Sequence, residues 1–190
     1  MTPHDMAQPG ESVDVTITYL RMEARPAYDR PSLPLGPPTA LIAAERPPAW
    51  YFLNLYTAVG GAHEWTDWLS RPTAELDAFI HDPAVTLYTL MRSGWPAGFF
   101  VLDSREGDLC ELSYFGLVPE AQGQRLGGYL LRTAIHMAWD RPGTKTLSVE
   151  TCTLDHPQAL GLYQKLGFTP VAQAQKTQIL TRPHPRIRQN

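Results

Sequence analysis

The stretch ELSYFGLVPEAQGQRLGGYLL, residues Glu111–Leu131, decides which fold the sequence predicts. Its first part is a mainly apolar, partly alternating run that ends at Pro119, as is typical of a β-strand. A turn with three glycines, Gln122–Gly128, follows, and apolar residues then recur at helical spacing. This order is a common phosphate-binding arrangement, because the first N–H groups of a helix are unpaired and glycines let a phosphate approach them. We therefore expect the rest of the chain to be organised around this turn.

The other elements follow from hydrophobic periodicity and from turn residues. Before the glycine turn, the sequence predicts strands at 13–19 and 39–44, helices at 50–59 and 74–81, and an antiparallel meander of strands at 85–92, 95–103 and 109–118. We expect Thr73 to cap the second helix, Ser93-Gly94 to form the first hairpin turn and 104–108 to form the second. After it, the sequence predicts a helix from Leu126 to the Arg141–Gly143 break, a strand at 146–154, a helix from Asp155 to about Leu166 that Gly167 ends, and a hairpin of 168–171 with 177–180.

Length and composition indicate one soluble globular domain. The chain has 190 residues, of which 43% are hydrophobic and 18% charged, and its net charge of -3 gives no general attraction to nucleic acids or anionic membranes. No apolar run approaches the roughly 20 residues of a membrane span, and the N-terminus lacks a secretory pattern. We expect a cytoplasmic protein with one domain at 13–182, a flexible N-terminus at 1–12, a flexible tail at 183–190, and no nucleic-acid or membrane partner.

Several chemistries are not supported by the motifs present. The cysteines, Cys110 and Cys152, are expected to be reduced thiols, and no His, Cys, Asp or Glu cluster has zinc spacing, so no metal is expected. The sequence has no Gly-x-Ser-x-Gly turn, and the glycine turn lacks the Lys-Ser/Thr of a nucleoside triphosphate loop. A dinucleotide fold would need parallel βαβ units, whereas the strand before the turn belongs to an antiparallel meander. What remains is a phosphate-bearing ligand on a mixed sheet, with no obvious nucleophile.

Two segments together resemble the GNAT superfamily, the acetyl-CoA-dependent N-acyltransferases. The family's turn reads Gln/Arg-x-x-Gly-x-Gly/Ala; here Gln122 and Gly127 fill the outer positions, while Arg125 stands where the first glycine is expected. The later VETCTLDHPQALGLYQKLGF resembles the family's strand and its helix ending in Tyr-x-x-x-Gly-Phe, here Tyr163 to Phe168. The resemblance covers about residues 13–182, and LYTAVGGAHEW and TCTLDHP also resemble a small bacterial subgroup. It implies an α/β (α+β) fold with a mixed, mainly antiparallel sheet flanked by helices, and a splayed cleft between the Leu109–Val118 and Thr146–Leu154 strands.

The resemblance also implies where acetyl-CoA binds. The strand end would pair with the pantetheine amides, and the N–H groups of the turn would hold the pyrophosphate. For Arg125, a phosphate contact and a solvated surface arginine are the two alternatives, since a guanidinium beside phosphate is favourable. The cofactor-binding candidates are Phe115, Gly116, Leu117, Val118, Gln122, Gly123, Gln124, Arg125, Leu126, Gly127, Gly128 and Asp155.

Two catalytic candidates come from the same resemblance. Tyr163 matches the family position of the acid that protonates the leaving thiolate, and a phenol with a pKa near 10 stays protonated at pH 7; the alternative is a core aromatic. Glu111 lies eleven residues before Gln122, an offset that matches the general-base glutamate of some members. Its alternative is a surface or ion-paired glutamate, and Glu150 on the neighbouring strand is the second candidate base.

Other residues carry weaker expectations. Asp155 and His156 stand where many family members have Asn, and a helix cap is favoured over a contact with CoA or Tyr163. Tyr56, Trp65 and Trp68 lie where the family binds its acceptor, and they either line an amine pocket or belong to the core or a dimer contact. Cys152 is expected to be a buried strand thiol rather than a nucleophile.

The sequence thus predicts an N-acetyltransferase that transfers acetyl from acetyl-CoA to a primary amine by direct attack, without a covalent enzyme intermediate. The alternative is a non-catalytic acyl-CoA-binding or sensing module. The acceptor stays unidentified, and a homodimer is left open.

Overall fold

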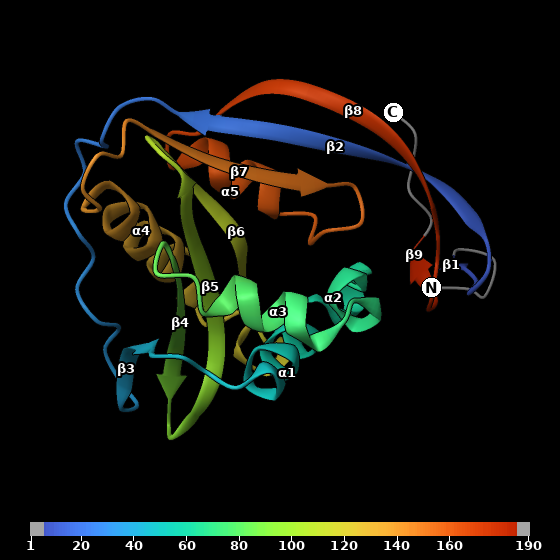
Figure 1. Cartoon of the computed structure of the whole chain (residues 1–190), viewed down its shortest axis with the longest axis horizontal. Coiled ribbons are helices and arrows are strands. Elements are labelled where there is room, and N and C mark those ends of the chain that lie inside the picture. Colours follow the sequence, from blue (N-terminus) through green and yellow to red (C-terminus); the bar gives the residue numbers. More distant parts are fainter. Residues whose placement is uncertain (1–5, 186–190) are drawn as a thin grey trace.

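The computed structural model describes residues 6–185 and contains one large mixed sheet (Figure 1). The seven-stranded sheet has the order β3-β4-β5-β6-β7-β2-β8, and a two-stranded sheet pairs β1 with β9. The strands are β1 Met6–Ala7, β2 Ser12–Met22, β3 Thr39–Ala44, β4 Val85–Arg92, β5 Trp95–Glu106, β6 Leu109–Leu117, β7 Thr146–Cys152, β8 Thr169–Ile179 and β9 His184–Pro185. The helices are α1 Ala49–Gly60, α2 Asp67–Ser70, α3 Thr73–Ile80, α4 Leu126–Trp139 and α5 Ala159–Lys165, with 3-10 turns at Gly61–His63 and Pro119–Ala121.

The pairing between β6 and β7 opens the cleft that the sequence predicts. It is parallel, whereas the other pairings in the large sheet are antiparallel. Its register covers only Leu109 with Thr146, Cys110 with Leu147, and Glu111 with Ser148. Beyond these pairs the two strands part, so the fold class and the splay between β6 and β7 are confirmed.

Helices cover both faces of the sheet where the core is densest. Phe99 and Phe100 are neighbours on β5, so their rings point to opposite faces, and both rings are fully buried. Phe99 packs against Phe52 of α1, and α4 contacts β5, β6 and β7. Figure 1 shows α1, α2 and α3 gathered on one side of β4–β6 and α4 on the other. These layers hold the start of α4 and the end of β6 in fixed positions.

The strand β2 occupies an unexpected place in the sheet. It lies between β7 and β8, pairing antiparallel with β7 through 17–22 and with β8 through 12–21. Figure 1 shows β2 and β8 running together as a long curved pair, with β1 and β9 at its far end. The sequence predicted this strand, but not that it would complete the C-terminal half of the sheet.

A predicted hairpin and a predicted turn of the sheet differ from what forms. The hairpin expected of 168–171 and 177–180 does not form, since 169–179 is one continuous strand whose partner is β2. The turn expected at 104–108 is shorter, because β5 continues to Glu106 and pairs it with Leu109. Gly107, with φ of 70°, then serves a two-residue turn.

Two predicted helix caps are also wrong. Thr73 is the first residue of α3, after Pro72, and makes no capping hydrogen bond. Asp155 does not begin α5, which starts at Ala159 after Gln158. The Asp155 carboxylate instead accepts hydrogen bonds from Thr151 and Cys152, the end of the preceding strand. The predicted left-handed end at Gly167 is confirmed by its φ of 102°.

The two ends of the described chain lie together. Met6–Ala7 pairs with His184–Pro185, and Ala7 packs with Val15, Leu154 and Leu180 in a small second core. The ends predicted to be flexible, 1–12 and 183–190, include this strand pair. Their outermost parts, 1–5 and 186–190, lie outside the described residues. Among residues 6–185, no helix combines the length and apolar character that crossing a membrane requires.

A close contact at the end of α1 gives the first prediction. A Cβ built on Gly60 would overlap the Trp65 ring, whereas one on Gly161 in α5 would meet nothing within 4 Å. We expect Gly60→Ala to lower the free energy of unfolding by about 1–3 kcal/mol, because the indole must move. Urea unfolding of the two variants measures this. Gly161→Ala is the matched control and should leave stability equal or raise it by up to about 1 kcal/mol; an unchanged stability of Gly60→Ala would contradict the packing.

Candidate functional site

A cleft of about 1400 Å³ begins where β6 and β7 part. It is lined by residues of β6, the glycine turn and α4, by residues of α1–α3, and by residues of β7, β2, β8 and α5. The sequence-predicted residues that line it are Glu111, Phe115, Gly116, Leu117, Gln122, Gly123, Arg125, Leu126, Gly127, Gly128, Asp155 and Tyr163. One cleft thus collects candidates that are spread over more than fifty residues of sequence.

Two predicted cofactor residues lie beside the cleft lining rather than in it. The Val118 amide donates to the Ala97 carbonyl, so that N–H is already used within the protein. The Gln124 side chain is exposed and donates from Nε2 to the Glu120 carbonyl at 3.0 Å. Any contact of these two residues with a ligand in the cleft would come from their remaining backbone groups.

The glycine turn leaves the start of α4 open to a ligand. No side chain caps the helix, which begins at Leu126, so its first N–H groups keep their capacity to bind an anion. A Cβ built on Gly128 would meet nothing within 4 Å, and one on Gly127 would meet only Leu117 Cδ1 at 3.8 Å. The space in front of the helix is therefore free, and the positive end of the helix dipole points into the cleft.

Arg125 occupies the position where the family pattern has glycine, and its backbone adopts the conformation that glycine favours. Its φ is 60° and its ψ is 15°, and Gly123 two residues earlier has φ of 75°. A left-handed conformation costs a non-glycine residue about 1–2 kcal/mol. Arg125 therefore has a glycine-like backbone, and the residue lies at the cleft wall.

Tyr163 on α5 presents a buried phenol to the cleft. Its side chain is 5% exposed, and its ring packs edge-on against Phe115 and Phe168. The residue is one of those that line the cleft. Burial, and to a lesser extent the charge of Asp155, raises the pKa of Tyr163 well above its usual value. The phenol is therefore held protonated at neutral pH.

Glu111 and Glu150 face the cleft from the two strands that part. Burial, then the charges of Glu150 and Asp103, raises the pKa of Glu111, and Arg105 partly opposes this. Burial followed by the charges of Asp155 and Asp67 likewise raises the pKa of Glu150, which is nevertheless solvent-accessible because the cleft is open. A carboxyl with a raised pKa is a better proton acceptor near neutral pH than an ordinary glutamate.

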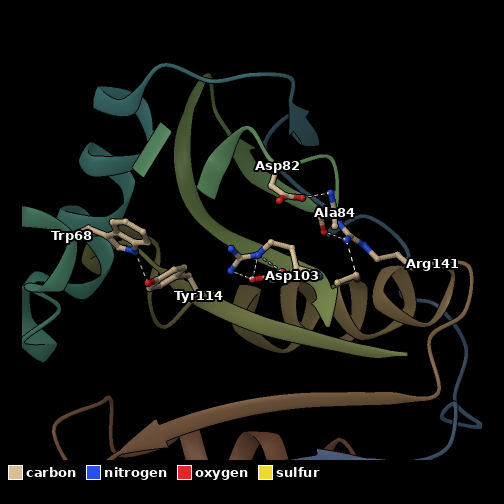
Figure 2. A network of polar contacts seen from close by, with 8 residues as sticks. Trp68, Asp82, Ala84, Asp103, Tyr114 and Arg141 are labelled. Atoms are coloured by element: carbon tan, nitrogen blue, oxygen red, sulfur yellow. Dashed lines mark hydrogen bonds and ion pairs between the residues drawn. The ribbon is translucent and has the colours of Figure 1, made fainter. Parts of the chain in front are cut away.

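Aromatic residues form the wall on the α1–α3 side. Tyr56 and Trp68 are almost fully buried, while Trp65 is half-buried, and all three line the cleft. Figure 2 shows Trp68 pointing toward Tyr114 of β6, whose hydroxyl accepts a 2.6 Å hydrogen bond from Trp68 Nε1. Burial raises the pKa of Tyr56 to about 12, so it is uncharged. This wall combines the two roles that the sequence left open, core packing and pocket lining.

An ion pair at the far end of the cleft was not predicted from the sequence. Arg105 Nε donates to both carboxylate oxygens of Asp103 at 3.0 Å, and its guanidinium lies over the Phe79 ring. Burial alone would raise the pKa of Asp103, but hydrogen bonds from Arg105 lower it overall. Both residues lie two positions apart on β5, a spacing that places them on one face of the strand.

Two further side chains in the cleft bear on the chemistry. Burial and the Asp155 charge raise the pKa of Cys152 to about 11, so its thiol is not a ready nucleophile. The register of β6 shifts between the pairs Tyr114–Val101 and Leu112–Leu102, which leaves Ser113 as a bulge residue. Its Oγ is buried without a partner, which sequence patterning could not reveal.

The described residues offer no grouping of three or more His, Cys, Asp or Glu side chains suited to a metal ion. The residues that line the cleft can take part in hydrogen bonding and proton transfer. An open helix N-terminus, a buried phenol and a carboxyl with a raised pKa share one cleft.

Comparison with known proteins agrees with this arrangement. The model of the acetyltransferase (GNAT) family matches residues 50–168. A Bacillus subtilis (strain 168) protein named "Putative ribosomal protein bS18-alanine N-acetyltransferase" is 29% identical over 102 residues, which cover 50% of this chain and 63% of that protein. The chain thus matches less than two thirds of the length of this curated relative.

Solved structures share the fold at low identity. A GCN5-related N-acetyltransferase from Sphaerobacter thermophilus has a TM-score of 0.60 at 16% identity, covering 95% of this chain and 55% of that one. One from Kribbella flavida has a TM-score of 0.54 at 18% identity, covering 90% and 58%. An aminoglycoside acetyltransferase from an uncultured soil sample has a TM-score of 0.54 at 14% identity, covering 67% and 86%. Since the family model spans well over half of its 190 residues, the chain belongs to the GNAT family of acetyltransferases.

Proposed function

We propose that this protein transfers acetyl from acetyl-CoA to a primary amine by direct attack, without a covalent enzyme intermediate. The observation that carries the proposal is the buried Tyr163 phenol, which lines the same cleft as the uncapped start of α4. A proton donor at the cleft wall suits a leaving group that becomes an anion during the reaction. The raised pKa of Cys152 also disfavours a thiol nucleophile.

The cofactor side of the cleft fits acetyl-CoA as the co-substrate. The first turn of α4, with Gly127 and Gly128, offers N–H groups and room for the pyrophosphate. The β6 segment Phe115–Leu117 is bonded to β5 on one edge, and its other edge faces the gap left by β7. Those free backbone groups can pair with the pantetheine amides.

The acceptor side of the cleft favours a basic amine. Glu111, Glu150 and Asp67 line it together with the aromatic wall, so a protonated amine would be attracted there and could lie against aromatic faces. We propose Glu111 as the general base that removes the proton from the attacking amine, directly or through water. The names of the relatives suggest two acceptors to try, a peptide beginning with alanine and an aminoglycoside.

A thiol-release assay tests the proposed function. Acetyl-CoA is mixed with the full chain and, in turn, an alanine-initiated peptide, a polyamine and an aminoglycoside, and the product is identified by mass spectrometry. We expect amine-dependent release of CoA and an amide product with at least one of the three. Acetyl-CoA binding without turnover on any of them would instead favour the non-catalytic binding or sensing module.

Replacing Tyr163 with Phe tests the acid. The variant keeps the ring contacts with Phe115 and Phe168 but removes the proton donor. We expect kcat to fall by about 100-fold, within the range for losing a general acid, with acetyl-CoA affinity nearly unchanged. Steady-state kinetics and calorimetric binding measure the two quantities. Turnover equal to wild type would remove Tyr163 from the mechanism.

Replacing Glu111 with Gln tests the base through its pH dependence. Because the pKa of Glu111 is raised, its carboxylate form is lost at a higher pH than for an ordinary glutamate. In wild type, kcat/KM should therefore fall as the pH drops through that raised pKa, and this acidic limb should disappear in Glu111→Gln along with roughly 100-fold in rate. Glu150→Gln is the matched comparison: if it alone removes the acidic limb, Glu150 is the base.

Two substitutions of Arg125 separate its charge from its backbone conformation. Arg125→Gly keeps the left-handed turn and removes the guanidinium, while Arg125→Glu also reverses the charge. If Arg125 contacts the pyrophosphate, acetyl-CoA affinity should fall about 10-fold in Arg125→Gly and further in Arg125→Glu. Isothermal titration measures the affinities, and wild-type values in both variants would show that Arg125 is a solvated surface residue. Urea unfolding should find Arg125→Gly as stable as wild type or up to about 1 kcal/mol more stable.

A further inference from the structure

The two halves of the sheet need another connection where the strands part. Past Glu111 and Ser148 no ladder joins β6 to β7. Side chains from two short segments cross the gap instead: the bridge segment His63–Trp65, which follows α1, and the loop Leu154–His156, which follows β7. Both segments line the cleft in part, and both belong to the stretches LYTAVGGAHEW and TCTLDHP that the sequence analysis singled out.

Asp155 is the centre of this connection. Its Oδ2 accepts hydrogen bonds from Thr151 Oγ1 at 2.7 Å and from the Cys152 amide at 2.8 Å, which fixes the carboxylate to the end of β7. Its Oδ1 accepts a hydrogen bond from Trp65 Nε1 at 3.3 Å. Both oxygens are therefore engaged within the protein, and α5 begins too late for Asp155 to cap it.

Trp65 belongs to the other half of the sheet. Its ring packs against Tyr56 of α1, Phe99 of β5 and Tyr114 of β6. Its amide donates to the Gly60 carbonyl at 3.1 Å, so the backbone of the bridge segment is anchored to the end of α1. The hydrogen bond from the Trp65 indole N–H to Asp155 therefore crosses the cleft. It joins the aromatic wall of Tyr56, Trp65 and Trp68, here called the acceptor wall, to the half of the sheet that contains β7.

The neighbours of Trp65 hold the bridge segment in the same way. Glu64 is 5% exposed, has a left-handed backbone with φ of 60°, and accepts hydrogen bonds from Thr181 and Arg182 after β8. The His63 ring is hydrogen-bonded through Nδ1 to the Leu154 carbonyl at 3.1 Å. A single short segment therefore reaches both loops that end the β7–β2–β8 half.

Asp155 also lies close enough to α5 to influence Tyr163. Its negative charge is the second cause, after burial, of the raised pKa of that phenol. One carboxylate therefore contacts the acceptor wall directly and acts electrostatically on the proposed acid.

We propose that Asp155 is a positioning residue. Its hydrogen bond to the Trp65 indole holds the acceptor wall in a fixed position relative to the Tyr163 side of the cleft. The inference rests on the proposed function, because that function assigns CoA to one side of the cleft and the amine to the other. The inference predicts that a ligand bound on the cofactor side changes the surroundings of the Trp65 indole through Asp155. It also predicts that Asp155 itself makes no contact with CoA.

Asp155→Asn is the informative variant. One amide oxygen can still accept from Thr151 and Cys152, so the loop keeps its internal bonds, but the amide NH2 then faces the Trp65 N–H and that bond is lost. Asp108→Asn is the matched control, since it removes an exposed carboxylate, paired with Lys145, from a different turn. The probe is coenzyme A, added to full-length protein labelled with ¹⁵N, and Trp65→Phe assigns the Trp65 indole signal.

The expected result has two parts. Coenzyme A shifts the Trp65 indole signal in wild type and Asp108→Asn but at least about fivefold less in Asp155→Asn, while its Kd stays within about twofold. With any amine that wild type acetylates, KM for the amine rises about 10-fold in Asp155→Asn, and the double variant Asp155→Asn/Trp65→Phe is no worse than either single variant.

Other results would contradict either the positioning role of Asp155 or the proposed function. An Asp155→Asn signal that responds as in wild type, or a wild-type signal that does not respond to bound coenzyme A, overturns the positioning role. A Kd weakened about 10-fold or more would make Asp155 a cofactor contact and overturn it as well. Failure of coenzyme A to bind wild type would overturn the proposed function first, and this inference with it.

Discussion

The structure depends on the point at which β6 and β7 cease to pair. Three register pairs join the strands, and beyond Glu111 and Ser148 their facing backbone groups have no strand partner. Unpaired N–H and C=O groups inside a protein must be satisfied by a ligand or by water. The parting therefore creates both the space of the cleft and a row of groups able to bind an extended amide-bearing chain. It also leaves the two halves of the sheet to be joined by packing on α4 and by side chains such as Trp65 and Asp155.

The glycine turn contains a left-handed backbone conformation at Arg125, although glycine is the residue that normally adopts it. Arg125 has φ of 60°, so the chain accepts an unfavourable backbone at the N-terminus of α4. Packing around the turn supports it, because Leu126 and Ala121 on either side are almost fully buried. The open space at Gly128 and the absent cap then leave the helix N–H groups accessible. Backbone geometry, rather than the glycine pattern alone, defines this anion site.

Much of this could be predicted from local sequence, and the exceptions share one cause. The meander, α4, Gly167 and the turn follow from periodicity and turn residues, and the splay followed from a family resemblance. The position of β2, the continuous strand β8 and the contact of Asp155 with Trp65 could not be predicted, because each depends on residues more than a hundred positions apart or across the cleft. Glu64 illustrates the limit: a glutamate after two glycines looks solvated, yet it is buried by partners from the far end of the chain.

Burial acts on the two proposed catalytic groups in opposite ways. For Glu111 a raised pKa strengthens the base while keeping it titratable, which favours proton removal from an amine. For Tyr163 a raised pKa guarantees a proton but weakens the acid, so donation to a neutral thioester sulfur would be unfavourable. An ordinary thiol has a pKa near 8.5 in water, and its thiolate form would also be destabilised in the same buried region. This restores the driving force for proton transfer from Tyr163 as the C–S bond breaks. Proton transfer from Tyr163 should therefore accompany bond cleavage rather than precede it.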